Sequence, residues 1–245
     1  MITKQNCNSP EFLESVNLAI GEEILVDKPL NWSSFKVIHE LRKALGVKKA
    51  GHAGTLDPRA TGLLIVCIGK STKKIISFQD LGKVYTGTIK LGESTPSMDG
   101  ETEVSETRSI EGITSQDVMA QIPKFTGLIT QIPPMYSAVN HNGTKLYKLA
   151  RKGRTVERNE RQVTITSFEI TDIQFPFVSF RIACSKGTYI RVIAHDLGEA
   201  LGCGGYLTSL RRESIGEYRA EDAFTPDELR LWGKEHSTTL HKQIT

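Results

Sequence analysis

The stretch Gly-His-Ala-Gly-Thr-Leu-Asp-Pro-Arg-Ala-Thr-Gly, residues 51–62, holds a single carboxylate, Asp57, among small residues. A basic segment precedes it, and an apolar run, Leu63–Ile68, follows it. A carboxylate held beside a core strand can act as a nucleophile, and glycines allow a substrate backbone to approach closely. An Asp before Pro can also cap a helix or close a turn, so a structural role for Asp57 stays open.

The residues around Asp57 disfavour several kinds of chemistry. No second carboxylate lies near it in the sequence, which argues against a paired-acid glycosidase. Neither a Ser-His-Asp arrangement nor a Walker loop occurs. The histidines show no ligand spacing, and the cysteines form no CxxC pair. We therefore expect buried free thiols and no metal site.

Four further side chains could bind or react, and each also has an ordinary structural explanation. Tyr85 could be a core aromatic, or a platform on which an extruded base stacks. Arg191 could be a solvated helix charge, or it could pair with a buried carboxylate and keep it ionised. Lys28 could be a turn lysine before Pro29, and His52 an ordinary loop histidine.

The formal net charge of +3 conceals a segregation of charge. Residues 145–161 hold seven Lys/Arg against two Glu, and residues 36–49 hold five against one. Residues 93–117 hold seven acids against one Arg. This pattern predicts a basic face for a polyanion, although each run could be a solvated surface. The longest apolar run cannot span a membrane and no signal pattern begins the chain, so we expect a cytoplasmic protein without a membrane partner.

The elements that must position these residues mix strands and helices. The patterns predict strands over Ile24–Val26, Leu63–Ile68, 83–92, Val163–Ile170, Phe177–Cys184 and Gly205–Arg211. They predict helices over Phe35–Leu45 (capped by Ser33 or Ser34), from residue 70 (capped by Ser71 or Thr72), over 118–125, before Gly153, and over Tyr189–Leu201. Because strands and helices do not alternate strictly, we expect one α+β domain.

Seven motifs in order carry a family resemblance: LVDKP, GHAGTLDPRATGLL, KVYTGTIKLG, IPPMYSAV, KLYKLARKG, CSKGTYIRVIAHDLG and LRR. Together they resemble the TruB family, the pseudouridine synthases that modify uridine 55 in the T-loop of tRNA. The resemblance runs from about Ile24 to Arg212. It implies the pseudouridine synthase catalytic fold, an α+β fold whose mixed, mostly antiparallel sheet is flanked by helices.

The resemblance also implies roles for three catalytic residues. Asp57 matches the aspartate that attacks the flipped uridine. Tyr85 matches the tyrosine that stacks on the target base, and Arg191 matches the arginine that pairs with the aspartate. The reaction breaks the N1–C1′ bond and rejoins the uracil through C5 without redox change or hydrolysis, so we expect no cofactor.

The remaining matches are expected to bind the substrate. His52 matches a histidine that holds flipped-out nucleotides, and Tyr189 and Leu210 match residues that line the uracil pocket. Lys28 and Pro29 match a motif that buttresses the active-site loop. The partner implied is the T-arm stem-loop of tRNA, whose phosphates the basic segments would grip. We expect a monomer.

The expected organisation is an N-terminal extension (1–23), a catalytic domain (24–212) and a short C-terminal tail (213–245). Residues 131–161 would form an RNA-gripping thumb within the catalytic domain. Many family members continue into a C-terminal PUA domain, and the tail is too short to form one.

Three alternatives to this function remain. The chain could be a non-catalytic RNA-binding or RNA-folding protein on the same scaffold. It could also be a pseudouridine synthase that acts on another RNA, such as ribosomal RNA. A small-molecule hydrolase with an Asp nucleophile is disfavoured by the charge segregation and by the lack of a second acid.

Overall fold

The computed structural model describes residues 1–18 and 20–236, and the chain falls into two compact units. Unit 1 comprises Met1–Val84 and Arg211–Thr245, and unit 2 comprises Tyr85–Leu210. Two strands, β4 (Lys83–Leu91) and β12 (Gly205–Ile215), have residues in both units. The single catalytic domain expected over 24–212 stays a prediction.

Unit 1 is built on antiparallel strands. β1 (Glu23–Lys28) pairs with β3 (Ala60–Ile68), with Lys28 opposite Gly62. β2 (Ala50–His52) pairs with the far end of β3, and β13 (Tyr218–Arg219) pairs with the end of β12, which neighbours β3. The strands over Ile24–Val26 and Leu63–Ile68 are thus confirmed and extended. The glycine-rich pattern of residues 47–62 predicts a long loop, and this prediction is wrong over Ala50–His52, which form the short strand β2.

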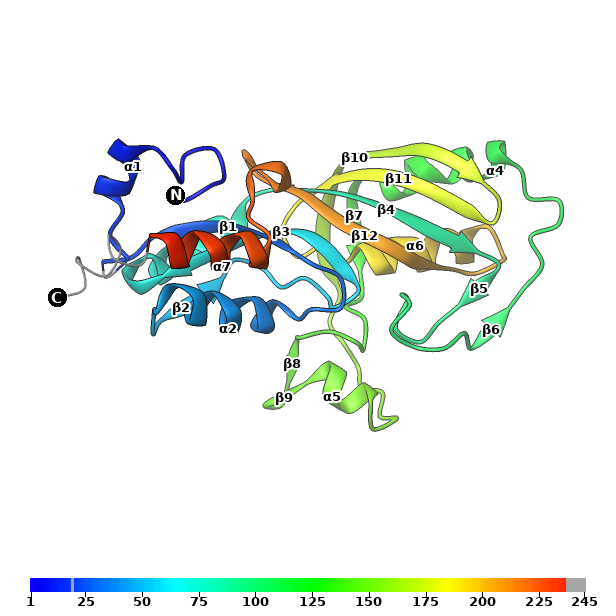
Figure 1. Cartoon of the computed structure of the whole chain (residues 1–245). Helices are drawn as coiled ribbons and strands as arrows, with labels where there is room; N and C mark the ends of the chain where they lie inside the picture. Colours follow the sequence, from blue (N-terminus) through cyan, green and yellow to red (C-terminus); the bar gives the residue numbers. More distant parts are fainter. Residues whose placement is uncertain (19, 237–245) are drawn as a thin grey trace. The chain divides into compact units, whose positions relative to one another are not determined.

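Two helices of unit 1 lie side by side, α2 (Ser34–Leu45) and α7 (Pro226–Glu235), as Figure 1 shows. They bury an apolar face of α2 and Trp232 of α7 in one core with β1 and β3. The other helices of unit 1 are α1 (Pro10–Ser15), η1 (Gly69–Lys74), α3 (Ile75–Asp80) and η3 (Ala220–Asp222). Ile2 and Val16 join the same core, so the N-terminal segment and α7 both help to build unit 1.

The ends of α2 follow the expected chemistry, whereas the start of the next helix does not. The Ser33 side chain caps α2 by accepting a hydrogen bond from Lys36 N, and Gly46 ends it at φ 66°. The predicted Ser71 or Thr72 cap is wrong. The chain enters the 3₁₀ turn η1 at Gly69 directly after β3, and the Thr72 hydroxyl donates back to the Gly69 carbonyl.

Unit 2 is a sheet with the strand order β12, β4, β11 (Phe177–Cys184), β10 (Arg161–Gln174) and β7 (Gly127–Gln131). β10 pairs antiparallel with both β11 and β7. α4 (Ser115–Gln121), η2 (Ile122–Phe125) and α6 (Ile190–Ala200) complete this part of unit 2. The strands expected over 163–170 and 177–184 and the helix expected over 189–201 are confirmed. β7 was not expected, because it is short and only its last residue, Gln131, is buried.

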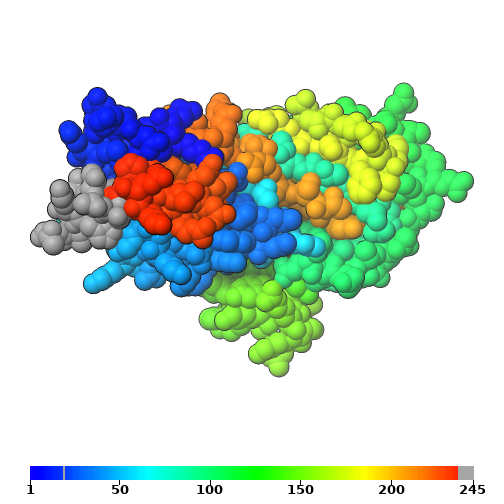
Figure 2. Space-filling model, viewed as in Figure 1, coloured from blue at the N-terminus to red at the C-terminus, as the bar shows by residue number. Residues whose placement is uncertain are grey.

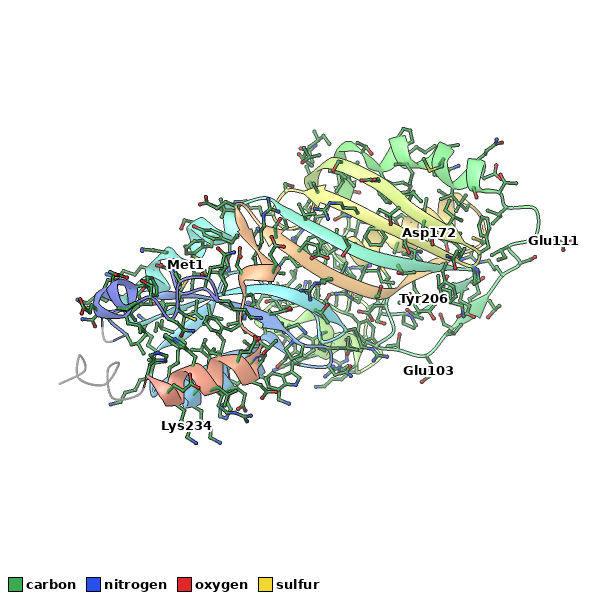
Figure 3. The ribbon with its side chains drawn as sticks, turned by 45° about the horizontal axis from the view of Figure 1, so that its top comes forward. Met1, Glu103, Glu111, Asp172, Tyr206 and Lys234 are labelled. Carbon is green, nitrogen blue, oxygen red and sulfur yellow. The ribbon has the colours of Figure 1, made fainter. Side chains whose placement is uncertain are left out.

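Two excursions leave the sheet of unit 2. β5 (Glu93–Ser94) pairs with β6 (Glu106–Thr107), and Figure 3 shows Glu103 and Glu111 at the outer edge, on either side of β6. The second excursion holds β8 (Asn140–His141), β9 (Thr144–Lys145) and α5 (Leu146–Ala150), and it projects from the rest of unit 2 (Figures 1 and 2). Asn142 and Gly143, both at positive φ, make the turn of this hairpin.

Candidate active site

Asp57 lies in the loop between β2 and β3, and the loop is anchored on both sides of it. Ala53 N donates to Ile65 O at 2.9 Å, and Ala60 N donates to Asp57 O at 3.0 Å. The Asp57 side chain is half-buried, and the side chains of Ala53 and Leu56 are buried. The loop therefore holds Asp57 through backbone bonds and two apolar anchors.

A buried serine from α2 fixes the residue before Asp57. The Ser34 hydroxyl accepts from Leu56 N at 2.9 Å and donates to Leu56 O at 3.1 Å. These two bonds satisfy both backbone groups of Leu56 in a buried place, where unpaired polar groups are costly. Ser34 was expected only as a possible helix cap, since its partner lies 22 residues further along the chain.

Lys28 is fully buried at the end of β1, where it binds backbone carbonyls of the turn after β1 and of the Asp57 loop. Its Nζ donates to Pro29 O at 3.0 Å, Trp32 O at 2.7 Å and Pro58 O at 3.4 Å. The bond to Pro58 connects the Lys-Pro turn to the residue after Asp57. This geometry fits the expectation that Lys28 buttresses the loop.

Burial lowers the pKa of Lys28 to about 8; the Asp57 carboxylate opposes that shift and Arg212 adds to it. Between pH 8 and its ordinary pKa of 10.5 the unfolded chain holds a proton on Lys28 that the folded chain has lost. The free energy of unfolding should therefore rise with pH across this window, by up to about 3 kcal/mol from Lys28 alone.

Urea unfolding of the wild type and Lys28→Met at pH 7.5, 8.5, 9.5 and 10.5 isolates this contribution. We expect the wild type to gain stability relative to the variant as the pH rises, because methionine does not titrate. A difference that stays flat or shrinks above pH 8 would contradict the shifted pKa.

A second buried cation, Arg212, lies against the glycines of the loop. Its side chain is 1% exposed, its Nε donates to Leu63 O at 2.7 Å and its Nη2 to Gly54 O at 3.2 Å. Burial, and after it the charge of Arg212, lower the pKa of His52 from 6.5. At pH 7 the His52 ring is therefore mainly neutral, with one ring nitrogen that donates a hydrogen bond and one that accepts.

Two glycines around Asp57 have no room for a side chain, because a Cβ there would clash with the protein's own atoms. A Cβ on Gly62 would lie 2.3 Å from Arg212 O, and Gly62 has φ +102°. A Cβ on Gly51 would lie 2.8 Å from the Ile75 side chain. The expected reason for these glycines was close approach of a substrate, but the approaching backbone at Gly62 is that of β12.

Unit 2 places Arg191 at the start of α6, with its side chain buried. Its Nη1 donates to Ser97 O and its Nη2 to Tyr136 O, both at 2.8 Å. Its Nε lies 3.6 Å from Asp99 Oδ2, and both side chains are almost fully buried. Arg191 is therefore not a solvated helix charge.

The sequence interpretation missed Asp99. The Asp99 side chain is buried, its Oδ1 accepts from Glu101 N at 2.9 Å, and Thr95 Oγ1 donates to its carbonyl at 2.8 Å. The sequence around Asp99 shows only an Asp-Gly pair among Ser and Thr residues, a pattern typical of an ordinary loop. Asp99 contacts Arg191 only because the fold brings two distant segments together, so the spacing of these residues in the sequence does not predict the contact.

The other residues expected at the site in unit 2 lie on three elements. Tyr189 occupies the N-cap position of α6, and its backbone N and O exchange two hydrogen bonds with the Gln131 side chain, at 3.0 and 3.2 Å. The Arg161 guanidinium lies 5.3 Å from the Tyr189 ring centroid. Tyr85 is 9% exposed on β4, whose buried face alternates as expected, and Leu210 is half-buried on β12.

The structure thus groups the predicted site residues into two sets. Unit 1 brings Lys28, His52 and Asp57 around one anchored loop, and unit 2 holds Tyr85, Tyr189, Arg191 and Leu210. Among residues 1–18 and 20–236, no three His, Cys, Asp or Glu side chains gather in a way that could hold a metal ion. Nor does any helix in that part of the chain have the length and apolar character needed to cross a membrane.

Comparison with solved structures defines the fold. A crystal structure titled as an archaeal box H/ACA sRNP Nop10-Cbf5 complex superposes with a TM-score of 0.67 at 24% identity, covering 97% of this chain. A Cbf5-Nop10-Gar1 complex gives 0.68 at 27% identity over 94% of this chain. The chain spans 61% of the length of each of these solved chains. The expected α+β pseudouridine synthase fold is confirmed.

Comparison of sequences defines the family. The model of the TruB family pseudouridylate synthase N-terminal domain matches residues 42–190, and that of the tRNA pseudouridylate synthase B C-terminal domain matches 191–245. The tRNA pseudouridine synthase B of Chlorobaculum tepidum is 51% identical over 84% of this chain and 88% of its own length. That of Chloroherpeton thalassium is 46% identical over 94% and 93%. The chain belongs to the TruB family of pseudouridylate synthases.

Proposed function

We propose that this chain isomerises uridine 55 in the T-loop of tRNA to pseudouridine. The observation that carries the activity is the identity of 46–51% with relatives named tRNA pseudouridine synthase B, over more than four fifths of the chain. The anchored Asp57 loop supports the same conclusion, because this isomerisation needs a nucleophile held still against the sugar and base.

Asp57 is the proposed nucleophile. Its carboxylate attacks the extruded uridine, and the N1–C1′ bond breaks. The uracil turns and forms a bond from C5 to C1′, the bond to Asp57 breaks, C5 loses its proton and N1 gains one. Arg191 keeps the nucleophilic carboxylate ionised, and Tyr85 stacks on the turning base. The burial of Arg191 supports its role, because a desolvated guanidinium interacts more strongly with a carboxylate than a solvated one does.

The remaining site residues hold the extruded nucleotides. His52 would bind flipped-out T-loop nucleotides through its neutral ring, and Tyr189 and Leu210 would line the uracil pocket. The hydrogen bonds between Tyr189 and Gln131 support a rigid pocket wall, since they hold the backbone of Tyr189 and so restrict the position of its ring. Base extrusion exposes the target atoms, which the folded RNA loop otherwise buries by stacking.

The projecting segment of β8, β9 and α5 supports a grip on the T-arm. It carries much of the basic run 145–161, whose cations would contact RNA phosphates with a strong dependence on salt. The proposal includes a monomeric enzyme acting in the cytoplasm, where tRNA is present.

The test is tritium release from uracil C5 of an unmodified T-arm stem-loop, of full-length tRNA and of a ribosomal RNA fragment. We expect release from the stem-loop and from tRNA. Release from ribosomal RNA alone would assign another substrate. Salt-sensitive binding without release from any RNA would favour an RNA-binding or RNA-folding protein.

The buried serine beside the loop provides a test of positioning. Ser34→Ala leaves both backbone groups of Leu56 unpaired, so we expect a loss of about 2–3 kcal/mol of stability and a 10- to 100-fold lower kcat. Ser33→Ala is the matched control. It removes the α2 cap, which costs about 1 kcal/mol, and should leave kcat unchanged.

Single-turnover rates and urea unfolding of the two serine variants separate these effects. Equal kcat values for Ser33→Ala and Ser34→Ala would show that the Leu56 bonds do not position Asp57.

A further inference from the structure

The entrance to α2 in unit 1 exposes apolar and aromatic side chains within six residues. Phe35 is 74% exposed and Leu30 is 51% exposed, while Trp32 is half-buried between them in sequence. Single exposed apolar residues are normal on a protein surface, but a local group of them marks a site of interaction. Neither the proposed chemistry nor the core of unit 1 uses the exposed ring of Phe35.

Cations accompany these rings. Lys36 Nζ lies 4.2 Å from the centroid of the Trp32 ring, a cation–π contact. His39, Arg42 and Lys43 are exposed at positions four, seven and eight after Phe35, so they share its face of α2. Lys36, Arg42 and Lys43 carry positive charges, and the face from Phe35 to Lys43 extends about 12 Å along the helix.

The same turn is bonded to the loop that carries Asp57. Asn31 N donates to Pro58 O at 2.8 Å, and the Asn31 side chain accepts from Arg59 at 3.3 Å. Lys28 binds Trp32 O and Pro58 O at once. An RNA strand that reaches Asp57 is therefore brought next to this turn.

We propose that Trp32, Phe35 and the exposed cations of α2 form a second RNA-binding surface, here called the α2 surface. An unpaired nucleobase of the substrate tRNA, other than the target uridine, stacks on Phe35. Phosphates of the same strand bind Lys36, His39, Arg42 and Lys43. The inference rests on the proposed function, because that function places tRNA at the Asp57 loop.

The chemistry of the α2 surface favours a single-stranded RNA segment over other partners. Aromatic faces beside cations are the usual platform for unpaired bases, and they accept any base sequence. A lipid surface would also accept exposed apolar groups and cations, and a second copy of the chain would accept the apolar groups alone. Neither of them accounts for the bonding of this turn to the Asp57 loop.

Three substitutions of Phe35 separate stacking from simple apolar contact. We expect Phe35→Ala and Phe35→Leu to raise the Kd for unmodified tRNA about 5- to 100-fold, and Phe35→Tyr to keep the wild-type Kd. Leucine retains the apolar bulk and lacks the flat face. Leu231→Ala, which removes a side chain 57% exposed on α7, is the control and should bind tRNA like the wild type.

The cations are tested through salt. In the double variant Arg42→Gln, Lys43→Gln we expect the slope of log K against log[salt] to be smaller by about 2, one for each lost phosphate contact. Binding is measured by fluorescence anisotropy at several salt concentrations, with thermal unfolding to verify that each variant is folded.

The outcomes distinguish this inference from the proposed function. Wild-type binding by Phe35→Ala and Phe35→Leu would overturn the α2 surface, while pseudouridine formation by the wild type would leave the function standing. Two results with an unchanged tRNA affinity would overturn the α2 surface. If Phe35→Ala has a smaller mass than the wild type in light scattering, the surface forms a dimer interface. If Phe35→Ala binds anionic vesicles more weakly than the wild type, the surface binds lipid. Absence of pseudouridine formation by the wild type would overturn the function, and the Kd series would still report on the surface.

Discussion

Asp57→Asn is expected to abolish pseudouridine formation, with kcat reduced at least about a thousandfold. The amide that replaces the carboxylate is neutral and is a poor nucleophile, so no covalent bond to the uridine forms. The two side chains have nearly the same shape, and the loop is also held by backbone bonds, the Ser34 hydroxyl, Lys28 and Arg212, which the substitution leaves in place. The Kd for tRNA should therefore stay within a few-fold of the wild-type value.

Tritium release under single-turnover conditions measures the rate, and anisotropy with unmodified tRNA measures the affinity. The control is Asp172→Asn, which neutralises an exposed carboxylate on β10 and should turn over like the wild type. If Asp57→Asn retained turnover within tenfold of the wild type, the nucleophile would be another group. A parallel loss of tRNA binding would instead show that the carboxylate holds the substrate.

Local patterns predicted those elements whose signals lie within one segment. α2 follows from a serine cap, an apolar face every three or four residues and a glycine stop, and the structure has all three. β10 and β11 follow from alternation. β11 has the predicted bounds, whereas β10 extends beyond the predicted 163–170 at both ends, because cross-strand pairing continues past the apolar residues. β7 has too few buried positions to stand out.

Tertiary contacts account for what the sequence could not predict at the site. Asp57, Lys28 and His52 were predicted, and unit 1 gathers them around one loop. Ser34 binds Leu56 from 22 positions away, and Arg191 meets Asp99 from another element. No spacing rule connects such pairs, because the sheet and the helices decide which segments meet.

Gly62 was predicted to matter, but for another reason, and its replacement by alanine is expected to have the largest effect on stability. A Cβ there would lie 2.3 Å from Arg212 O and 2.7 Å from Arg212 N, and φ is +102°. Backbone atoms cannot rotate away as a side chain can, so β3 and β12 would have to separate locally. We expect Gly62→Ala to lower the free energy of unfolding by about 3–5 kcal/mol, through strain at positive φ and the clash together.

Gly54→Ala is the matched comparison within the same loop. Gly54 also has positive φ, +90°, but its Cβ would find only the Arg212 side chain, at 3.6 Å. It should therefore cost only the backbone strain, about 1–2 kcal/mol. Urea unfolding of both variants at pH 7 measures the difference between their free energies of unfolding. Equal losses of stability would show that β12 moves away from a Cβ at Gly62 without a measurable loss of stability.

The strand register predicts that the damage at Gly62 spreads to the site. Gly62 lies opposite Lys28, whose ammonium binds Pro58 O beside Asp57. A shift of β3 large enough to relieve the clash should lengthen that bond, so kcat of the folded fraction should fall as well. Gly54→Ala leaves this pairing intact, and a kcat loss confined to Gly62→Ala would show that the packing of β3 against β12 positions the catalytic loop.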